Sequence, residues 1–523
     1  MTPATLLRLA VAGTRADTLR IALTACGALL GTLALLAAAT VLAIPTLHDP
    51  ANPYGVGMAP YTNGLLREPG LRPGLAFALV MLSIPVLLFV GQCARLGAPA
   101  RDRRLAAIRL AGATPRQGLA VAAAESGVAT LVGTALGLLV YLVGRRLLDA
   151  PDAQNLRPLP TDVLPHWAAL AGVVLGLPMI ATLATTLLLR RVTVTPLGVV
   201  RRVRTGSPRP WPGMLIVLGI AAYALLAPAQ LDAERHGSPL PAPVVAMVLF
   251  LGGLGAAIGV VGGTGWISYA VGGLLSRYAR RPAALIAGRR LQADPWSGSR
   301  ALAALLAAVL FAGGAAWVSS WFRTRQRVEA KSQHLVDLAA GQQDIVHPPN
   351  DFYLRTMQLV GYAVLVAGLI AAAGLAVTVA SSVVERRRTL ASLTASGVPR
   401  SVLGRAILWQ TLSVAAPALV LAVGTGVALG RGLLQPTVVN DSSSITTCAP
   451  PPDKADVCDS TDPAERDPYT RIVTAPKVSE QVRIPWADLV VIGGWATGAT
   501  TLVAGLGLVF LRASTAPEEL RTT

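Results

Sequence analysis

The chain has 523 residues, of which 53% are hydrophobic and only 14% are charged, and its mean hydropathy is +0.56. Soluble globular proteins carry about 25% charged residues, so this composition excludes an ordinary soluble domain and predicts a polytopic membrane protein. The formal net charge of +18 would suit a nucleic-acid-binding protein, but the placement of the charges removes the need for such a partner.

Ten apolar segments follow one another along the chain, and a transmembrane helix needs about 20 such residues. We therefore predict an all-α fold with about ten transmembrane helices. The first segment is longer than the core of roughly 7–15 residues in a signal peptide, so we expect it to stay in the mature protein. The predicted helices span residues 21–44, 73–94, 118–143, 166–189, 213–226, 243–266, 301–317, 354–384, 407–429 and 486–511.

Basic residues gather on alternate connecting segments. Segments 1–20, 95–117, 190–212, 277–300, 385–405 and 512–523 together hold 28 Lys and Arg but only six acids. The five remaining connections hold 17 basic residues and twenty acids. Positive charge marks the cytoplasmic side of short loops. Both termini are therefore predicted to be cytoplasmic. The membrane topology accounts for the positive net charge of the chain without a nucleic-acid partner. The ratio of 42 Arg to 3 Lys suggests a bacterial source, so we expect the bacterial cell membrane.

One basic stretch occurs twice. Residues 101–117 read RDRRLAAIRLAGATPRQ, and residues 386–403 read RRRTLASLTASGVPRSVL. Each copy is half apolar and lies between two long hydrophobic runs, which is typical of a short helix on the cytoplasmic membrane surface. A basic loop with one amphipathic helix would explain a single copy. The duplication favours two coupling helices that receive force from a soluble partner.

The duplication also divides the chain. The predicted first four and last four helices form two repeats in the same orientation, and two linker helices join them. We predict a first repeat at residues 1–205, a linker at 206–276 and a second repeat at 277–523, the last with an external loop at 431–485. A stripe of small residues is expected to allow close helix packing: Gly133, Gly137, Gly424, Gly426 and Gly430.

Each repeat resembles the FtsX-like permease domain of MacB-type ABC transporters. The shared pattern is a basic cluster, an apolar-spaced helix, a glycine corner with Pro-Arg, and an acid thirteen residues after the glycine. The first copy reads Arg103, Leu105, Ile108, Leu110, Gly112, Pro115, Arg116 and Glu125, and the second reads Arg388, Leu390, Leu393, Gly397, Pro399 and Arg400. The second copy departs from the pattern at Gln410, which stands where the acid is expected.

The resemblance implies a permease subunit that transmits ATP-driven motion and is not itself an enzyme. The chain contains no G-x-x-x-x-G-K-[ST] loop, so we expect it to bind no cofactor, with ATP and Mg²⁺ held by a separate ABC ATPase. Two coupling helices predict two ATPase copies. The expected cargo is amphipathic: a drug, an antimicrobial peptide or a lipid. The predicted coupling residues are Arg101, Arg103, Arg104, Leu105, Ile108, Leu110, Gly112, Arg116, Arg386, Arg388, Leu390, Leu393, Gly397 and Arg400.

Glu125 and two cysteines are further candidates. An acid within a membrane span is a functional candidate for gating or proton coupling, although Glu125 could instead pair with Arg109 or Arg116 and orient the coupling helix. Cys448 and Cys458 lie ten apart in the longest external loop, where a disulfide is plausible. That loop is rich in polar residues and is predicted to be coil. It contains no His, which disfavours a metal site.

Two other functions remain open from the sequence. The chain could be a transmembrane regulator of an external hydrolase or sensor kinase, although family members of that kind usually carry a large external domain. It could also be a secondary transporter, which would require paired charges or broken helices inside the membrane. Membrane lipid is an expected contact in every case, and an external partner or substrate is possible.

Overall fold

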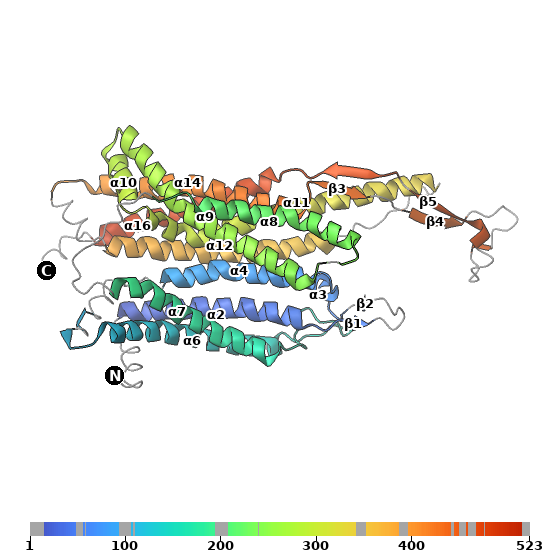
Figure 1. Ribbon diagram of the computed structural model, residues 1–523, viewed down its shortest axis with the longest axis horizontal. Helices are drawn as coiled ribbons and strands as arrows, with labels where there is room; N and C mark the ends of the chain where they lie inside the picture. Colours follow the sequence, from blue (N-terminus) through green and yellow to red (C-terminus); the bar gives the residue numbers. More distant parts are fainter. Residues whose placement is uncertain are drawn as a thin grey trace.

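The computed structural model describes residues 15–48, 56–57, 59–93, 106–107, 110–193, 208–238, 240–340, 352–385, 396–440, 444–448, 457–458, 467–474 and 476–514. Ten helices within these ranges are long and apolar enough to cross a membrane, in agreement with the predicted all-α polytopic fold. They run along the long axis of the molecule, and α2 (Arg15–Ala43) begins, and α16 (Trp486–Ser514) ends, near one end of it (Figure 1). We call this the termini end, and the opposite end the ribbon end.

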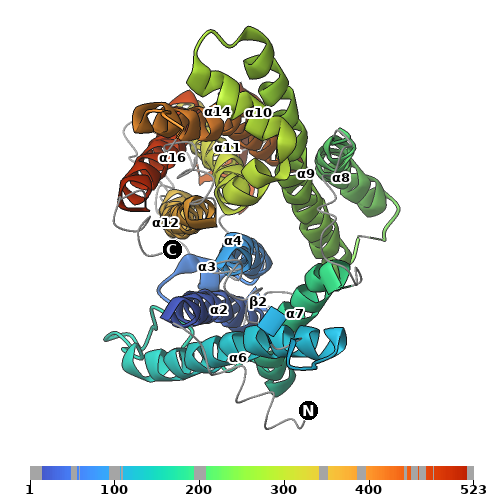
Figure 2. The same ribbon diagram turned by 90° about the vertical axis from the view of Figure 1, so that its left-hand side faces the viewer.

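Two four-helix bundles repeat the same arrangement. In the first, α2 contacts α4 and α6, and α6 contacts α7; in the second, α11 contacts α12 and α14, and α14 contacts α16. Viewed from the termini end, the bundles lie on opposite sides, with α4 facing the second bundle (Figure 2). The helices are α2 (Arg15–Ala43), α4 (Arg72–Cys93), α6 (Pro115–Leu147), α7 (Trp167–Thr193), α11 (Trp296–Ala339), α12 (Phe352–Glu385), α14 (Arg400–Leu433) and α16 (Trp486–Ser514).

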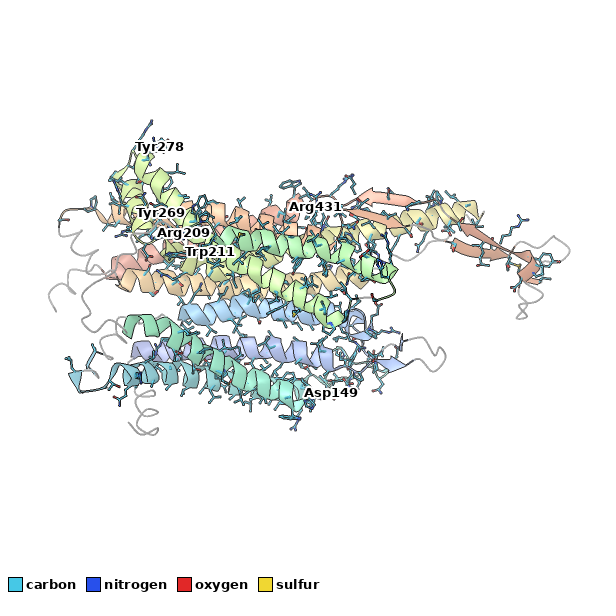
Figure 3. The ribbon with its side chains drawn as sticks, in the orientation of Figure 1. Asp149, Arg209, Trp211, Tyr269, Tyr278 and Arg431 are labelled. Atoms are coloured by element: carbon cyan, nitrogen blue, oxygen red, sulfur yellow. A yellow bond between two sulfur atoms is a disulfide. The ribbon has the colours of Figure 1, made fainter. Side chains whose placement is uncertain are left out.

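Three helices connect the bundles: α8 (Pro212–Arg235), α9 (Ala242–Tyr278) and α10 (Pro282–Ala293). α9 packs on α11 and α14, so the linker lies beside the second bundle. Both linker spans are longer than predicted. The helix-favouring run that follows Pro228 extends α8, and small residues carry α9 past Trp266 to Tyr278. Tyr269 and Tyr278 mark the termini end of α9, whereas Asp149 and Arg431 lie toward the ribbon end (Figure 3).

Small residues allow the equivalent helix pairs to approach closely. A Cβ added at Gly133 of α6 would lie 2.3 Å from the Ala25 carbonyl of α2, and one at Gly426 of α14 would lie 2.1 Å from the Leu310 carbonyl of α11. Interfaces of this kind are typical of membrane helices, because lipid gives helices no hydrophobic reason to associate. The predicted small-residue contact is confirmed at these positions, but Gly424 has open space around it.

Gln92 on α4 joins the two bundles. Its side chain is buried, and its Nε2 donates to the carbonyls of Arg300 (3.1 Å) and Ala301 (3.3 Å) in the first turns of α11. A Cβ added at Gly374 of α12 would lie 2.2 Å from Gln92 Oε1. A larger residue at position 374 would therefore have to displace the Gln92 amide.

The predicted polar coil between α14 and α16 is wrong, because its described part forms a β-ribbon. Each of its two antiparallel strand pairs keeps one register along its length. In the first pair, Thr437 is opposite Gln481 and Asn440 is opposite Val478; in the second, Cys448 is opposite Thr470. The ribbon consists of β3 (Thr437–Asn440), β4 (Ser444–Cys448), β5 (Thr470–Thr474) and β6 (Val478–Gln481), with a short helix η2 (Asp467–Tyr469) before β5. It reaches beyond the helices at the ribbon end (Figure 1).

An extension of α11 supports the base of this ribbon. The helix continues past the predicted span of residues 301–317 to Ala339. Trp317 and Val328 of α11 form a buried cluster with Val438 and Val482 of the ribbon. A two-stranded hairpin is marginally stable alone, so this cluster anchors its base. Further out, Cys448 forms the predicted disulfide with Cys458.

A smaller cap covers the ribbon end of the first bundle. The buried Arg72 side chain donates to the carbonyls of Ile44, Pro45 and Leu66, and Tyr61 donates to Asp162. The Asp162 carboxylate and burial raise the pKa of the Tyr61 hydroxyl. The cap elements are β1 (Leu47–His48), β2 (Val56–Gly57) and α3 (Gly64–Arg67).

Candidate coupling site

The first predicted corner is a sharp bend at the termini end. A helical turn ends where the Ala111 N–H donates to the Ala107 carbonyl at 3.0 Å. Gly112 follows with φ = +93°. Only glycine adopts that backbone region readily, because a Cβ would clash with the following carbonyl. Thr114 then caps α6 through a capping box with Gln117.

The second corner repeats this backbone. Gly397 also has φ = +93°. The residue two places later, Pro399, is extended (φ −65°, ψ 139°), as is Thr114 in the first copy (φ −68°, ψ 155°). α14 begins three residues after its glycine, as α6 does. Two segments 285 positions apart therefore form the same bend.

The Pro-Arg pair is offset between the copies. Pro115 is the first residue of α6, but Pro399 precedes the first residue of α14. Arg400 therefore matches Pro115 in backbone position, one residue before the position of Arg116. The sequence pattern aligned the two arginines, and the structure does not.

The corners expose apolar surface at the termini end. Leu110 is 90% exposed, and the neighbouring Ala106 and Ala107 are exposed helical residues. Arg116 is exposed as well. Leu110 has the highest exposed fraction of the large hydrophobic side chains among the described residues. The predicted coupling residues that lie outside the described ranges are Arg101, Arg103, Arg104, Leu105, Ile108, Arg386, Arg388, Leu390 and Leu393.

Glu125 lies ten residues into α6, about 15 Å along the helix from its start. Its carboxylate accepts a hydrogen bond from Arg20 Nη2 of α2, and the two side chains are only 5% and 6% exposed. The expected pairing with Arg116 is wrong, because nine residues of helix separate it from Glu125, and Arg109 lies outside the described ranges. The ion pair joins the helix that leaves the first corner to α2.

The described residues of the second bundle show no equivalent of this link. Gln410 occupies the position equivalent to Glu125 and carries no charge. Arg300, near the start of α11, instead pairs with Asp294 at 3.1 Å, just before that helix. The two corners share a backbone geometry, but among the described residues a buried charge pair next to a corner is found only in the first bundle, between α6 and α2.

The described residues contain no group of three or more His, Cys, Asp or Glu side chains that could hold a metal ion. The residue that sequence reasoning missed is Arg20, which is 105 positions from Glu125. An arginine at the start of an apolar span was the available signal, because a buried cation needs a partner.

Fold and site together define a multi-pass helical membrane protein built from two parallel bundles, each with a glycine corner at the same end. Comparison with known families agrees: the FtsX-like permease C-terminal family matches residues 75–197 and 361–515, together more than half of the chain. The chain belongs to this family. The matched ranges contain one corner each, and the family implies a membrane permease component of an ABC-type system. Comparison with curated proteins gives no match.

Proposed function

We propose that this chain is the permease of an ATP-driven exporter and that its two corners receive force from two copies of a separate ABC ATPase. The observation that carries the proposal is the pair of glycine bends with the same φ of +93° at the same end of the molecule. A bend of fixed geometry can transmit a push into the rigid helix that follows it. A loose loop would absorb the push.

Charge supports a cytoplasmic position for the corners. In the sequence, the 28 basic residues lie on the connections between helices whose described ends are at the termini end, and positive residues favour the cytoplasmic side. The disulfide lies at the ribbon end, as expected for an oxidising exterior. Both termini are then cytoplasmic, and the β-ribbon is external.

The first corner is the better connected of the two. Motion of α6 reaches α2 through Arg20 and Glu125, and α2 contacts α4. α4 in turn contacts α11 and α12 of the second bundle. A push on one corner therefore has a packed route across the seam to both bundles.

The cargo is proposed to be amphipathic and drawn from the membrane or its outer face. α6, α7 and α8 expose many apolar side chains, as lipid-facing helices do. A second function, control of an external hydrolase or sensor kinase, is favoured by one feature: the ribbon that projects past the helices (Figure 1).

Co-purification tests the proposal. The chain is expressed with its genomic neighbours, and recovery of an ATPase with Walker motifs is measured for the wild type and for Leu110→Glu. The control is Leu159→Glu, since Leu159 is 44% exposed at the ribbon end. We expect the Leu110 variant alone to recover less ATPase, because the second corner still binds one copy. Equal recovery with both variants, or no ATPase with the wild type, would contradict the proposal.

A further inference from the structure

A hollow of about 440 Å³ lies at the base of the ribbon, between α11 and β3, within the roughly 300–1,000 Å³ of ligand pockets. On the α11 wall, the lining residues follow Trp321 at intervals of four, seven and eight positions, so they share one face of the helix. The wall on the other side comes from β3 and the residue that leads to it. The lining residues are Trp321, Arg325, Val328, Glu329, Gln435, Thr437, Val438, Val439 and Asn440.

The hollow meets β3 at its edge. Successive residues of a strand point to opposite faces, so a pocket on one face would be lined by alternate residues. Here all four consecutive residues of β3 line the hollow, and β6 contributes none. The pocket therefore lies along the edge of β3 that is not paired with β6.

The ladder identifies which backbone groups face that edge. The Val482 N–H donates to the Pro436 carbonyl at 2.7 Å, so this is a hydrogen-bonded pair. Such pairs alternate along an antiparallel ladder, which places Val438 and Asn440 in bonded pairs with β6. Thr437 and Val439 then direct their N–H and C=O groups away from β6 and toward the hollow. Among the described residues, no strand pairs with this edge.

Charge at the ribbon base is positive. The described residues there that form the printed ion pairs and charge contacts comprise six cations and three anions: Arg323, Arg325, Arg327, Lys331, Arg431 and Arg483 against Glu329, Glu480 and Asp488. Within the hollow, Arg325 lies 5.6 Å from the centre of the Trp321 ring and 5.7 Å from that of Tyr353. Its Nε donates to Glu329 at 2.8 Å. The remaining guanidinium N–H groups can receive a carboxylate in bidentate form.

We propose that this groove binds an extended peptide segment that carries a carboxylate. The peptide adds to the free edge of β3 as a third strand, and its carboxylate binds Arg325. Addition of a strand uses the backbone groups of Thr437 and Val439, gives affinity from main-chain hydrogen bonds, and covers the exposed face of α11. The site needs no ATPase, so it goes beyond the proposed function and stands or falls separately from it.

The test uses the full-length protein in lipid nanodiscs. The probe is a fluorescein-labelled hexapeptide of sequence threonine–valine–threonine–valine–threonine–aspartate with a free carboxyl end, and binding is measured by fluorescence anisotropy. We expect saturable binding. A peptide with N-methyl groups on alternate residues, which cannot complete the ladder, should bind at least about tenfold more weakly. A version with asparagine in place of aspartate and an amidated end should weaken similarly.

Two variants locate the site. Val439→Pro removes an N–H only at the free edge, where proline is tolerated because the ladder to β6 is spared; Val439→Thr retains that N–H. Arg325→Gln removes the proposed carboxylate partner, whereas Arg327→Gln alters a cation near Glu480 on the other side. The proline and Arg325 variants should each lose at least about tenfold in affinity, with their controls unchanged.

Absence of saturable binding, or equal binding by Val439→Pro and the wild type, would overturn the proposal. So would self-association through this edge, seen as protein dimers that the peptide does not displace. Ribbon folding is checked in every variant by protease protection of the ribbon, which keeps loss of binding distinct from loss of structure. ATPase recovery with Leu110→Glu does not bear on this outcome.

Discussion

The buried pair between Arg20 and Glu125 gives the most quantitative prediction. Replacement Glu125→Gln keeps the shape of the side chain but removes the negative charge opposite a guanidinium that is about 6% exposed. Removing one member of a buried ion pair typically costs about 3–5 kcal/mol. The pair lies near the termini end of the membrane span, so we expect the lower value, about 3 kcal/mol.

An exposed ion pair provides the comparison. Arg325 and Glu329 are paired on the surface of α11, with side chains 43% and 38% exposed. Exposed i,i+4 pairs contribute only about 0.3–0.5 kcal/mol. Glu329→Gln should therefore leave stability almost unchanged. Both variants remove one negative charge, so the difference between their stability losses measures the effect of burying the ion pair.

The assay is unfolding in mixed detergent micelles, followed by tryptophan fluorescence. The double variant Arg20→Met with Glu125→Leu removes both charges and should recover most of the loss, because no uncompensated charge then remains. Glu125→Gln should also reduce ATPase-dependent activity more than it reduces ATPase recovery, since the link to α2 is broken while the corner stays intact. A stability loss below about 1 kcal/mol for Glu125→Gln would refute the reasoning.

Three further predictions concern the corner and the ribbon. Gly112→Ala should destabilise the corner by about 1–2 kcal/mol, because an alanine is strained at a positive φ. Both ATPase recovery and thermal stability should fall. Gly70→Ala should change neither quantity, because Gly70 has open space around it and no positive φ. Cys448→Ser should lower the stability of the ribbon by about 2–3 kcal/mol, which faster proteolysis of the ribbon would report. An unchanged rate of proteolysis would contradict a stabilising role of the disulfide. The Lys331 ammonium lowers the pKa of Glu480 below 4.5, so the pair stabilises the ribbon above that pH and is lost as pH falls through the lowered pKa. The protease sensitivity of the wild-type ribbon should therefore rise below about pH 4.5, whereas that of Glu480→Gln should already be raised at pH 7. Equal pH profiles for the two proteins would contradict a stabilising role of the Lys331–Glu480 pair.

Membrane spans were predictable because their signal is local. Apolar length alone determines a span, and the ten predicted helices match the ten candidates in the described ranges. The positions at which helices end were harder to predict. α8 runs to Arg235 because polar helix-forming residues continue it beyond the apolar window that defined its prediction.

The corners were predictable in position but not in geometry. Duplication identified Gly112 and Gly397, and the shared φ explains why both are glycine. The offset of 285 positions already places Arg400 opposite Pro115 in the sequence, but only the structure shows that both positions begin a helix.

Contacts between distant residues could not be predicted. Local spacing offered Arg116 as the partner of Glu125, but nine helical residues span about 13 Å, too far for a side-chain contact. The true partner, Arg20, becomes a neighbour only when α2 packs on α6. The ribbon was missed for the same reason: Thr437 pairs with Gln481 across 44 positions, and polar Ser and Thr residues conceal the alternation that usually marks a strand.

Site-specific photo-crosslinking tests the central claim most directly. A photoreactive residue is placed at Leu110, at Val398 or, as the control, at Leu159, and cells are irradiated before the membranes are solubilised. The account predicts adducts with the same Walker-motif ATPase from Leu110 and from Val398, and none from Leu159. Adducts from only one corner, or an ATPase adduct at Leu159, would contradict it.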